Sequence, residues 1–196
     1  DTRELERVLL DQKEELEALR NKSFCHRLEE SQIDLNSNLA QVVIGVRRSG
    51  KSTLCFNALE KSKVRYAYVN LDDENLYGLT VKDMNDILQV LYSIYGNFTH
   101  LFLDEIQNIK GWHLFVNRML RKGMHVLLTG SNSKLLSGEL ASHLTGRHHT
   151  IELLPFSFRD WCNYNGIATA PLTTKNMGIL MGAFDKYLRQ GGFPEL

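Results

Sequence analysis

Short apolar runs that alternate with helical stretches constrain the fold of this chain more than any other feature. The runs are rich in Val, Ile and Leu, and they lie at residues 40–45, 65–71, 99–104, 125–129 and 150–154. Helical patterns fall between them at 54–61, 80–95, 112–122 and 133–142. Strands that alternate with helices at this spacing are typical of βαβ units. The sequence therefore predicts an α/β fold, a parallel sheet with helices on both faces.

The segments on either side of this alternation are predicted to be helical. Residues 1–27 carry leucines at helical spacing, although Gln12 interrupts the apolar stripe, and they form an amphipathic helix. A helix docked on the core is favoured over a partner-binding or coiled-coil helix, because the pattern spans only three heptads. Residues 28–155 form the core. Residues 156–196 are expected to be a helical extension.

Composition limits the classes of partner. The chain has 196 residues, 43% of them hydrophobic, with 23 basic and 23 acidic residues. A net charge of zero gives no support to a general affinity for nucleic acid or anionic membranes, so any anion site must be local. Three distant cysteines fit neither a disulfide framework nor a zinc site, which favours a cytoplasmic protein. No apolar run is long enough to predict a membrane span.

The stretch GVRRSGKST, which begins at Gly45, predicts a phosphate-binding loop. Two glycines are followed by Lys51 and Ser52 in the spacing of a P-loop, and the stretch lies between a predicted buried strand and a predicted helix. In that position, backbone N–H groups and a helix N-terminus can point at phosphate oxygens. Lys51 would reach the β- and γ-phosphates, and Ser52 would offer its hydroxyl to Mg²⁺.

Other residues of the loop are expected to line the same site. The candidates for nucleotide contact are Gly45, Arg48, Ser49, Gly50 and Thr53. Arg47 and Arg48 could add charge next to the phosphates, or they could point away and pair with acids or with a neighbouring subunit. The sequence leaves both possibilities open.

A predicted apolar strand delivers two adjacent carboxylates, Asp104 and Glu105, to its C-terminal end. In open parallel sheets ligands bind at that edge, so Asp104 is expected near the phosphate loop, where it would hold Mg²⁺. Glu105 is placed to orient and deprotonate a water in line with the γ-phosphate. A kinase needs no such water-activating base, so this residue favours hydrolysis.

Two further positions are candidates for sensing or stabilising the γ-phosphate. Ser131 and Asn132 follow the fourth predicted strand, where they could contact the attacking water or simply cap the next helix. Arg147 follows a glycine before the fifth predicted strand. It could stabilise transferring phosphate in its own site or in a neighbour's, or it could serve a structural ion pair.

Several blocks of the sequence resemble the bacterial and archaeal AAA-type P-loop ATPases. The resemblance runs from about residue 28 to the end, and its later blocks are more diagnostic than the phosphate loop. The matching blocks are GVRRSGKST, LFLDEIQNIKGW, LLTGSNSKLLSGELASHLTGR, LLPFSFRDW and YLRQGGFPEL.

The resemblance implies a P-loop sheet of the additional-strand type, with strand order 5-1-4-3-2. Carried over by motif, Lys51 and Ser52 are the Walker A pair and Asp104 and Glu105 are Walker B, while Ser131 or Asn132 is the sensor. The resemblance alone implies adenine as the base, and it implies a further C-terminal domain after the Gly-Gly-Phe-Pro segment.

The leading hypothesis is therefore a slow, Mg²⁺-dependent ATPase that couples loss of the γ-phosphate to movement of an attached C-terminal domain or a neighbouring subunit. The neighbouring subunit could be a second copy of the chain in a homo-oligomer. A nucleotide-gated switch with negligible turnover is the alternative. A small-molecule kinase is a third hypothesis, and Glu105 argues against it.

Overall fold

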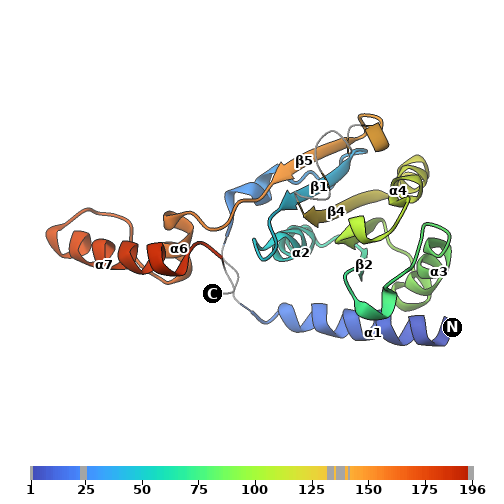
Figure 1. Ribbon diagram of the computed structural model, residues 1–196, viewed down its shortest axis with the longest axis horizontal. Helices are drawn as coiled ribbons and strands as arrows, with labels where there is room; N and C mark the ends of the chain where they lie inside the picture. Colours follow the sequence, from blue (N-terminus) through green and yellow to red (C-terminus); the bar gives the residue numbers. More distant parts are fainter. Residues whose placement is uncertain (1, 23–25, 132–134, 136–139, 141, 194–196) are drawn as a thin grey trace.

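The fold is a five-stranded parallel sheet with helices on both faces (Figure 1). The computed structural model describes residues 2–22, 26–131, 135, 140 and 142–193. The strands are β1 (Ala40–Gly45), β2 (Tyr66–Asn70), β3 (His100–Asp104), β4 (His125–Ser131) and β5 (His148–Glu152). Their order is β2-β3-β4-β1-β5, which confirms the predicted α/β fold and the predicted order of the strands.

The helices match most of the predicted stretches. They are α1 (Thr2–Leu19), α2 (Lys51–Ser62), α3 (Met84–Tyr95), α4 (Trp112–Arg121), α6 (Phe158–Tyr164) and α7 (Thr174–Gln190). Three short 3₁₀ helices lie between them: η1 (Leu28–Gln32), η2 (Glu74–Leu76) and η3 (Ile106–Asn108). Most of the helix predicted at 133–142 lies outside the described residues.

Some element boundaries differ from the predicted ones. The second helix begins at Lys51 instead of residue 54, because Gly50 in a left-handed conformation caps it directly after the loop. The third helix begins at Met84, and the Asp83 carboxylate accepts hydrogen bonds from both the N–H and the hydroxyl of Thr80. The fifth strand lies two residues earlier than predicted, in register with β1 from Ala40 onward.

Two apolar clusters cover the two faces of the sheet. One contains the inward faces of α3 and α4, and the other contains that of α2. Alternate strand residues divide between the clusters, as the two-residue period of a strand requires. Val42 and Leu101 point to the first cluster, and Val43 and Phe102 point to the second. The sheet is therefore buried on both faces, which explains the continuous apolar runs in the sequence.

Helix α1 runs along the edge of the sheet beside β2 and α3 (Figure 1). Val8 and Leu9 join one apolar cluster and Leu16 joins the other. Gln12 is buried, and its amide accepts from the Asn70 N–H at 2.9 Å and donates to the Asn70 carbonyl oxygen at 3.1 Å. A side chain thus completes the hydrogen bonding of an edge strand that no further strand covers.

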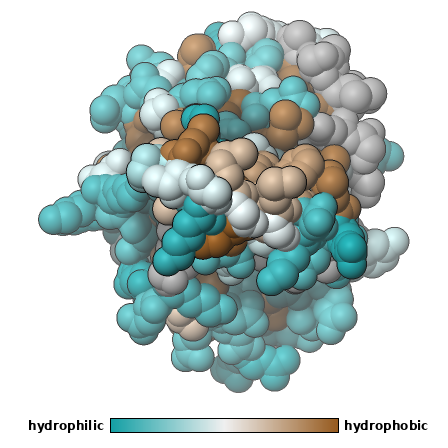
Figure 2. All heavy atoms as spheres, turned by 90° about the vertical axis from the view of Figure 1, so that its left-hand side faces the viewer, coloured by the Kyte–Doolittle hydropathy of each residue, from teal (hydrophilic) through white to brown (hydrophobic). Residues whose placement is uncertain are grey.

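The α6–α7 unit lies to one side of the sheet and has a small core of its own (Figure 1). Arg27 links it to the N-terminal segment, because its guanidinium donates to the Leu154 carbonyl oxygen at 2.7 Å and stacks 4.8 Å from the Phe156 ring. Large apolar side chains also remain exposed on α7, namely Met177, Ile179, Met181, Phe184 and Leu188. Seen from this side, the surface shows apolar side chains grouped among hydrophilic ones (Figure 2).

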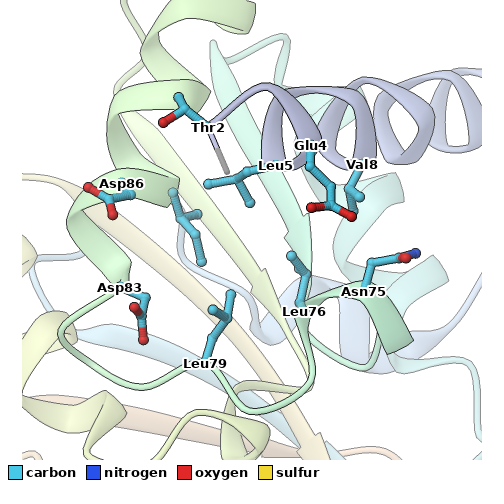
Figure 3. Close-up of a pocket in the computed structure, with 10 residues that line it drawn as sticks. Thr2, Glu4, Leu5, Val8, Asn75, Leu76, Leu79, Asp83 and Asp86 are labelled. Atoms are coloured by element: carbon cyan, nitrogen blue, oxygen red, sulfur yellow. The ribbon is translucent and has the colours of Figure 1, made fainter.

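A cavity of about 280 Å³ opens between α1, η2 and the start of α3 (Figure 3). Leu5, Leu76 and Leu79 line it together with the carboxylates of Glu4 and Asp86. None of its lining residues belongs to the phosphate loop or to the acidic end of β3.

None of the helices in the described part of the chain has both the length and the apolar character that crossing a membrane requires.

Candidate functional site

The predicted phosphate loop connects the C-terminal end of β1 to the N-terminus of α2. Arg48 and Gly50 have φ angles of 63° and 92°, so the chain makes a left-handed turn immediately before the helix. A Cβ atom at Gly45 would collide with the Leu153 carbonyl oxygen and lie 2.8 Å from Ser49 Oγ. The two glycines of the motif therefore serve different purposes, since Gly45 allows a close approach and Gly50 allows the turn.

Lys51 lies at the start of α2 with its side chain almost fully buried. Its Nζ donates to the Val46 carbonyl oxygen at 3.1 Å and lies 3.5 Å from Glu105 Oε1. The loop lysine and the acid that directly follows β3 are thus close together, although they are 54 residues apart in the chain (105 minus 51).

Asp104 ends β3 beside the first turn of α2. Its Oδ1 accepts a hydrogen bond from Ser52 Oγ at 2.9 Å and another from Thr129 Oγ1. Its Oδ2 accepts from the Tyr68 hydroxyl at 3.2 Å. The carboxylate is buried, and hydroxyl groups from α2, β4 and β2 surround it. The predicted meeting of Asp104 with the phosphate loop is therefore present in the structure.

Burial dominates the electrostatics around this carboxylate. Burial raises the pKa of Asp104, the hydrogen bonds from Thr129 and Ser52 lower it, and the neighbouring Glu105 raises it again, so the net shift is upward. Burial also raises the pKa of the Cys55 thiol well above its usual value, and the Asp104 charge adds to the effect. Cys55 is thus an inert core thiol. A cation bound next to Asp104 would stabilise the charged form of this buried carboxylate.

Glu105 adopts a left-handed backbone conformation, with φ 55°. Its N–H donates to Thr129 Oγ1 at 2.9 Å, which fixes the turn after β3. Its carboxylate lies between two groups, because Oε1 faces Lys51 Nζ and Oε2 accepts from Gln107 Nε2. Non-glycine residues rarely adopt this conformation, and those that do are concentrated at functional sites.

The two arginines of the loop have different environments. Arg47 donates to Asp72 Oδ2 at 2.6 Å, and Asp72 also accepts from Asn108 Nδ2 at 3.0 Å. The structure therefore shows the pairing of Arg47 with an acid that the sequence left open. Arg48 is exposed at the tip of the loop and has the left-handed conformation described above.

The other predicted contact residues are placed as follows. Ser49 is fully buried, and its N–H donates to the Val46 carbonyl oxygen at 3.3 Å within the loop. Thr53 lies in the first turn of α2 and is partly exposed. Ser131 ends β4 in register with Gly45, next to the start of the loop. Asn132 lies outside the described residues.

Arg147 lies at the N-terminal ends of β1 and β5, whereas the phosphate loop lies at the C-terminal end of β1. Its carbonyl oxygen accepts from the Ala40 N–H at 3.0 Å, at the point where β1 and β5 begin. The phosphate loop follows the other end of β1, about 17 Å away along a strand that rises about 3.3 Å per residue. Of the three roles that the sequence left open for Arg147, this position gives no support to action in its own site, because a parallel strand separates its two ends. Contact with a neighbour's site and a structural role both remain consistent with its exposed position.

Three residues of the site were not among the sequence candidates. Tyr68 contacts Asp104 from β2, Thr129 contacts both Asp104 and Glu105 from β4, and Gln107 contacts Glu105 from η3. Thr129 could have been found, since it belongs to the polar end of the fourth predicted strand. Tyr68 carried no signal, because a tyrosine within an apolar strand is typical of a core position.

The oxygen atoms of the site fit magnesium. Mg²⁺ prefers oxygen ligands and is usually held by one or two carboxylates together with substrate phosphates and waters. Ser52 and Asp104 supply a hydroxyl and a carboxylate 2.9 Å apart. Among the described residues no group of three or more His, Cys, Asp or Glu side chains is arranged to hold a metal ion. A cation at this site would therefore take its remaining ligands from phosphate oxygens and waters.

Solved structures that align with this chain include a DnaA and a Pif1 protein. AMPPCP-bound DnaA from Aquifex aeolicus aligns with a TM-score of 0.47 and 18% identity, over 81% of this chain and 57% of that one. Bacteroides Pif1 bound to ssDNA gives a TM-score of 0.47 and 17% identity, over 81% of this chain and 49% of that one. Both TM-scores lie below 0.5, so the family to which the chain belongs follows from its sequence and not from these structures.

Two curated proteins are similar over most of the chain. An uncharacterized protein of Methanocaldococcus jannaschii is 34% identical over 193 residues, which is 97% of this chain and 42% of the relative. An uncharacterized protein of Haemophilus influenzae is 30% identical over 171 residues, which is 82% of this chain and 41% of the relative. The chain thus spans about two fifths of the length of these relatives.

A family model described as an AAA domain matches residues 37–162. The matched segment contains the sheet, the phosphate loop and the acidic end of β3. Because it covers more than half of the sequence, the chain belongs to the AAA domain family of P-loop proteins.

Proposed function

We propose that this chain binds ATP together with Mg²⁺ and hydrolyses it. The observation that carries the proposal is the meeting of the phosphate loop with the acidic strand end, where Ser52 Oγ lies 2.9 Å from Asp104 Oδ1 and Lys51 Nζ lies 3.5 Å from Glu105 Oε1. Membership of the AAA domain family supports nucleotide binding in general. ATP as the nucleotide, magnesium as the cation and hydrolysis as the outcome are parts of the proposal.

The residues of the loop would bind the triphosphate. The loop from Gly45 to Gly50 presents N–H groups at the N-terminus of α2, where the helix dipole favours negative charge. Lys51 would leave the Val46 carbonyl oxygen and donate to the β- and γ-phosphates. Ser52 and Asp104 would hold Mg²⁺, which when bound neutralises charge on the phosphate oxygens.

Glu105 would act as the general base. Its carboxylate lies beside Lys51, so it would stand next to the terminal phosphate that this lysine binds. From there it would orient a water for attack and accept the proton as the bond to phosphorus forms. Thr129 would keep both acids in place, since its hydroxyl joins the Asp104 side chain to the Glu105 backbone. Ser131, in register with Gly45 at the start of the loop, would sense the terminal phosphate. Asn132, which lies outside the described residues, is the alternative sensor.

The α6–α7 unit is the part through which a change at the site would reach a partner. The exposed Met177, Met181, Phe184 and Leu188 recur at spacings of four, three and four residues, so they share one face of α7. Such a face would be covered by an attached domain or a neighbouring subunit. The relatives are more than twice as long as this chain, which is consistent with an attached domain.

The test compares binding with turnover. Glu105→Gln should still bind Mg·ATP by calorimetry, while the rate of phosphate release falls about 10²- to 10⁴-fold, the scale of a positioned base. Glu14→Gln is the matched control, because it removes an exposed carboxylate on α1 and should change neither quantity. Absence of Mg·ATP binding by the parent protein would refute the proposal, and equal turnover by Glu105→Gln would remove this residue from the role of base.

A nucleotide-gated switch is the second candidate function, and one observation favours it. Both oxygens of the Glu105 carboxylate are engaged, one facing Lys51 and the other accepting from Gln107. A base held in this way would act rarely. Single-turnover measurements separate the two functions, because a switch retains ATP tightly and releases almost no phosphate, whereas an ATPase releases a full equivalent.

A further inference from the structure

The position of Tyr68 on β2 gives it access to Asp104 on the adjacent strand. Tyr68 is paired in register with Phe102, and Asn70 is paired with Asp104, so Tyr68 and Asp104 lie diagonally on the same face of the sheet. The Tyr68 ring packs against Phe102 with their centroids 5.0 Å apart. Its hydroxyl then reaches past Phe102 and donates to Asp104 Oδ2 at 3.2 Å. Diagonal neighbours in a sheet are within reach of an aromatic side chain.

The two oxygens of Asp104 have different partners, and this difference matters for metal binding. Oδ1 accepts from Ser52 and Thr129, and Ser52 is the residue whose hydroxyl would turn toward Mg²⁺ under the proposed function. Among the described residues, Oδ2 has its hydrogen bond from Tyr68. When Ser52 turns away, Tyr68 and Thr129 are left to fix the plane of the carboxylate.

We infer that Tyr68 is a positioning residue that orients Asp104 for Mg²⁺. The inference rests on the proposed function, because it assigns a role within the same site. Both side chains are buried, so water cannot readily replace the phenol as a donor. Groups that orient a metal ligand in this way typically change metal affinity about 10- to 100-fold when removed.

The chain offers a matched control on the same strand. Tyr66 lies two residues before Tyr68, so it points to the same face of the sheet, and its hydroxyl donates to Glu60 Oε1 at 2.7 Å, a bond outside the site. Tyr66→Phe and Tyr68→Phe remove the same atom from the same strand. A general effect of losing a phenol from β2 would appear in both variants, and an effect on Asp104 would appear only in Tyr68→Phe.

The experiment measures nucleotide binding without turnover. Binding of a non-hydrolysable ATP analogue is followed by calorimetry at increasing Mg²⁺ concentrations, and again in EDTA, with folding checked by circular dichroism. Mg²⁺ should increase the affinity for the analogue, and for Tyr68→Phe the Mg²⁺ concentration that gives half of this increase should rise about tenfold. Its affinity in EDTA should equal that of the parent, and Tyr66→Phe should match the parent in both measurements.

A second measurement isolates the pathway through Asp104. In an Asp104→Asn background, adding Tyr68→Phe should cause no further change in the Mg²⁺ dependence, because the group that Tyr68 orients no longer carries charge. The inference is overturned if Tyr68→Phe leaves the Mg²⁺ dependence unchanged, if it weakens binding equally in EDTA, or if its effect persists beside Asp104→Asn. A parent protein that binds no nucleotide refutes the proposed function itself, which is a distinguishable result.

Discussion

Gln12→Glu tests whether α1 is fixed to the sheet edge by one buried amide. The change keeps the shape of the side chain and replaces its Nε2 donor with an oxygen. In the structure Nε2 lies 3.1 Å from the Asn70 carbonyl oxygen and 2.8 Å from Asp73 Oδ2. The new carboxylate would therefore lose both hydrogen bonds and face another carboxylate at contact distance.

The magnitude follows from these distances. Loss of the two hydrogen bonds, to the Asn70 carbonyl oxygen and to Asp73, costs about 2 kcal/mol. Repulsion between two charges about 2.8 Å apart ranges from roughly 1.5 kcal/mol in water to about 6 at an effective dielectric constant of 20. Because Asp73 is partly exposed, the lower value applies. The free energy of unfolding should fall by about 3.5 kcal/mol at pH 7.

The dependence on pH has a definite sign. In the parent, burial raises the pKa of Asp73, but hydrogen bonds from Gln12 and Asn75 outweigh it and lower the pKa. Asp73 therefore stabilises the fold above its unfolded pKa, and this contribution is lost as the pH falls through the folded pKa. In the variant, the new carboxyl has a raised folded pKa. Its protonated form is favoured in the fold, so the destabilisation should shrink to about 1 kcal/mol near pH 4.

Urea denaturation at pH 7 and near pH 4 measures both effects, with the slope of the transition checked for constancy. Gln89→Glu is the matched control, because it introduces the same charge at an exposed position of α3 and should change stability by less than 0.5 kcal/mol. A loss below 1 kcal/mol at pH 7, or a loss that does not shrink in acid, would refute the view that Gln12 pairs with the strand edge.

Two further predictions concern the loop and the amino edge of the sheet. Gly50 has φ 92°, so Gly50→Ala should destabilise the loop by about 1 to 2 kcal/mol and weaken nucleotide binding. Gly178→Ala is the control in α7, where a Cβ meets nothing within 4 Å, and it should leave nucleotide binding unchanged. Equal nucleotide affinities of Gly50→Ala and the parent, measured by calorimetry, would contradict this prediction. His100 is buried, and burial lowers its pKa while the Leu35 carbonyl oxygen accepts from its ring, so stability should fall as the pH drops below the unfolded value of about 6.5. His100→Gln should weaken that dependence in thermal melts between pH 7 and pH 5, and an unchanged slope would exclude His100 as its source.

The strands and the phosphate loop could be predicted because their signals are local. The run at 40–45 is apolar on both faces, and its bounds coincide with those of β1. Gly45, Lys51 and Ser52 could be identified because the spacing of a phosphate loop is a property of consecutive residues. Asp104 was recognised from its place at the end of an apolar run. The order of the strands followed from the resemblance to a family and not from any local pattern.

Arg147 shows what consecutive residues do not encode. The sequence predicts that Arg147 precedes a strand. Whether the start of that strand lies near the phosphate loop depends on the direction of the neighbouring strands. Because β5 runs parallel to β1, both strands begin at the end opposite the phosphate loop, so an arginine before β5 is far from that loop. A single-residue pattern carries no information about that distance.

Sequence alone determined which segments are strands and helices and which residues can bind phosphate, because backbone propensity, glycine geometry and charge act over a few neighbouring residues. Tertiary structure alone decided what surrounds those groups. Gln12 interrupts an apolar stripe in the sequence, yet it pairs with the edge of β2, 58 residues away. Tyr68 belongs to an apolar strand, yet its hydroxyl contacts Asp104 across the sheet. Hydrogen bonds of this kind form between residues that only the register of the sheet and the packing of the helices bring together.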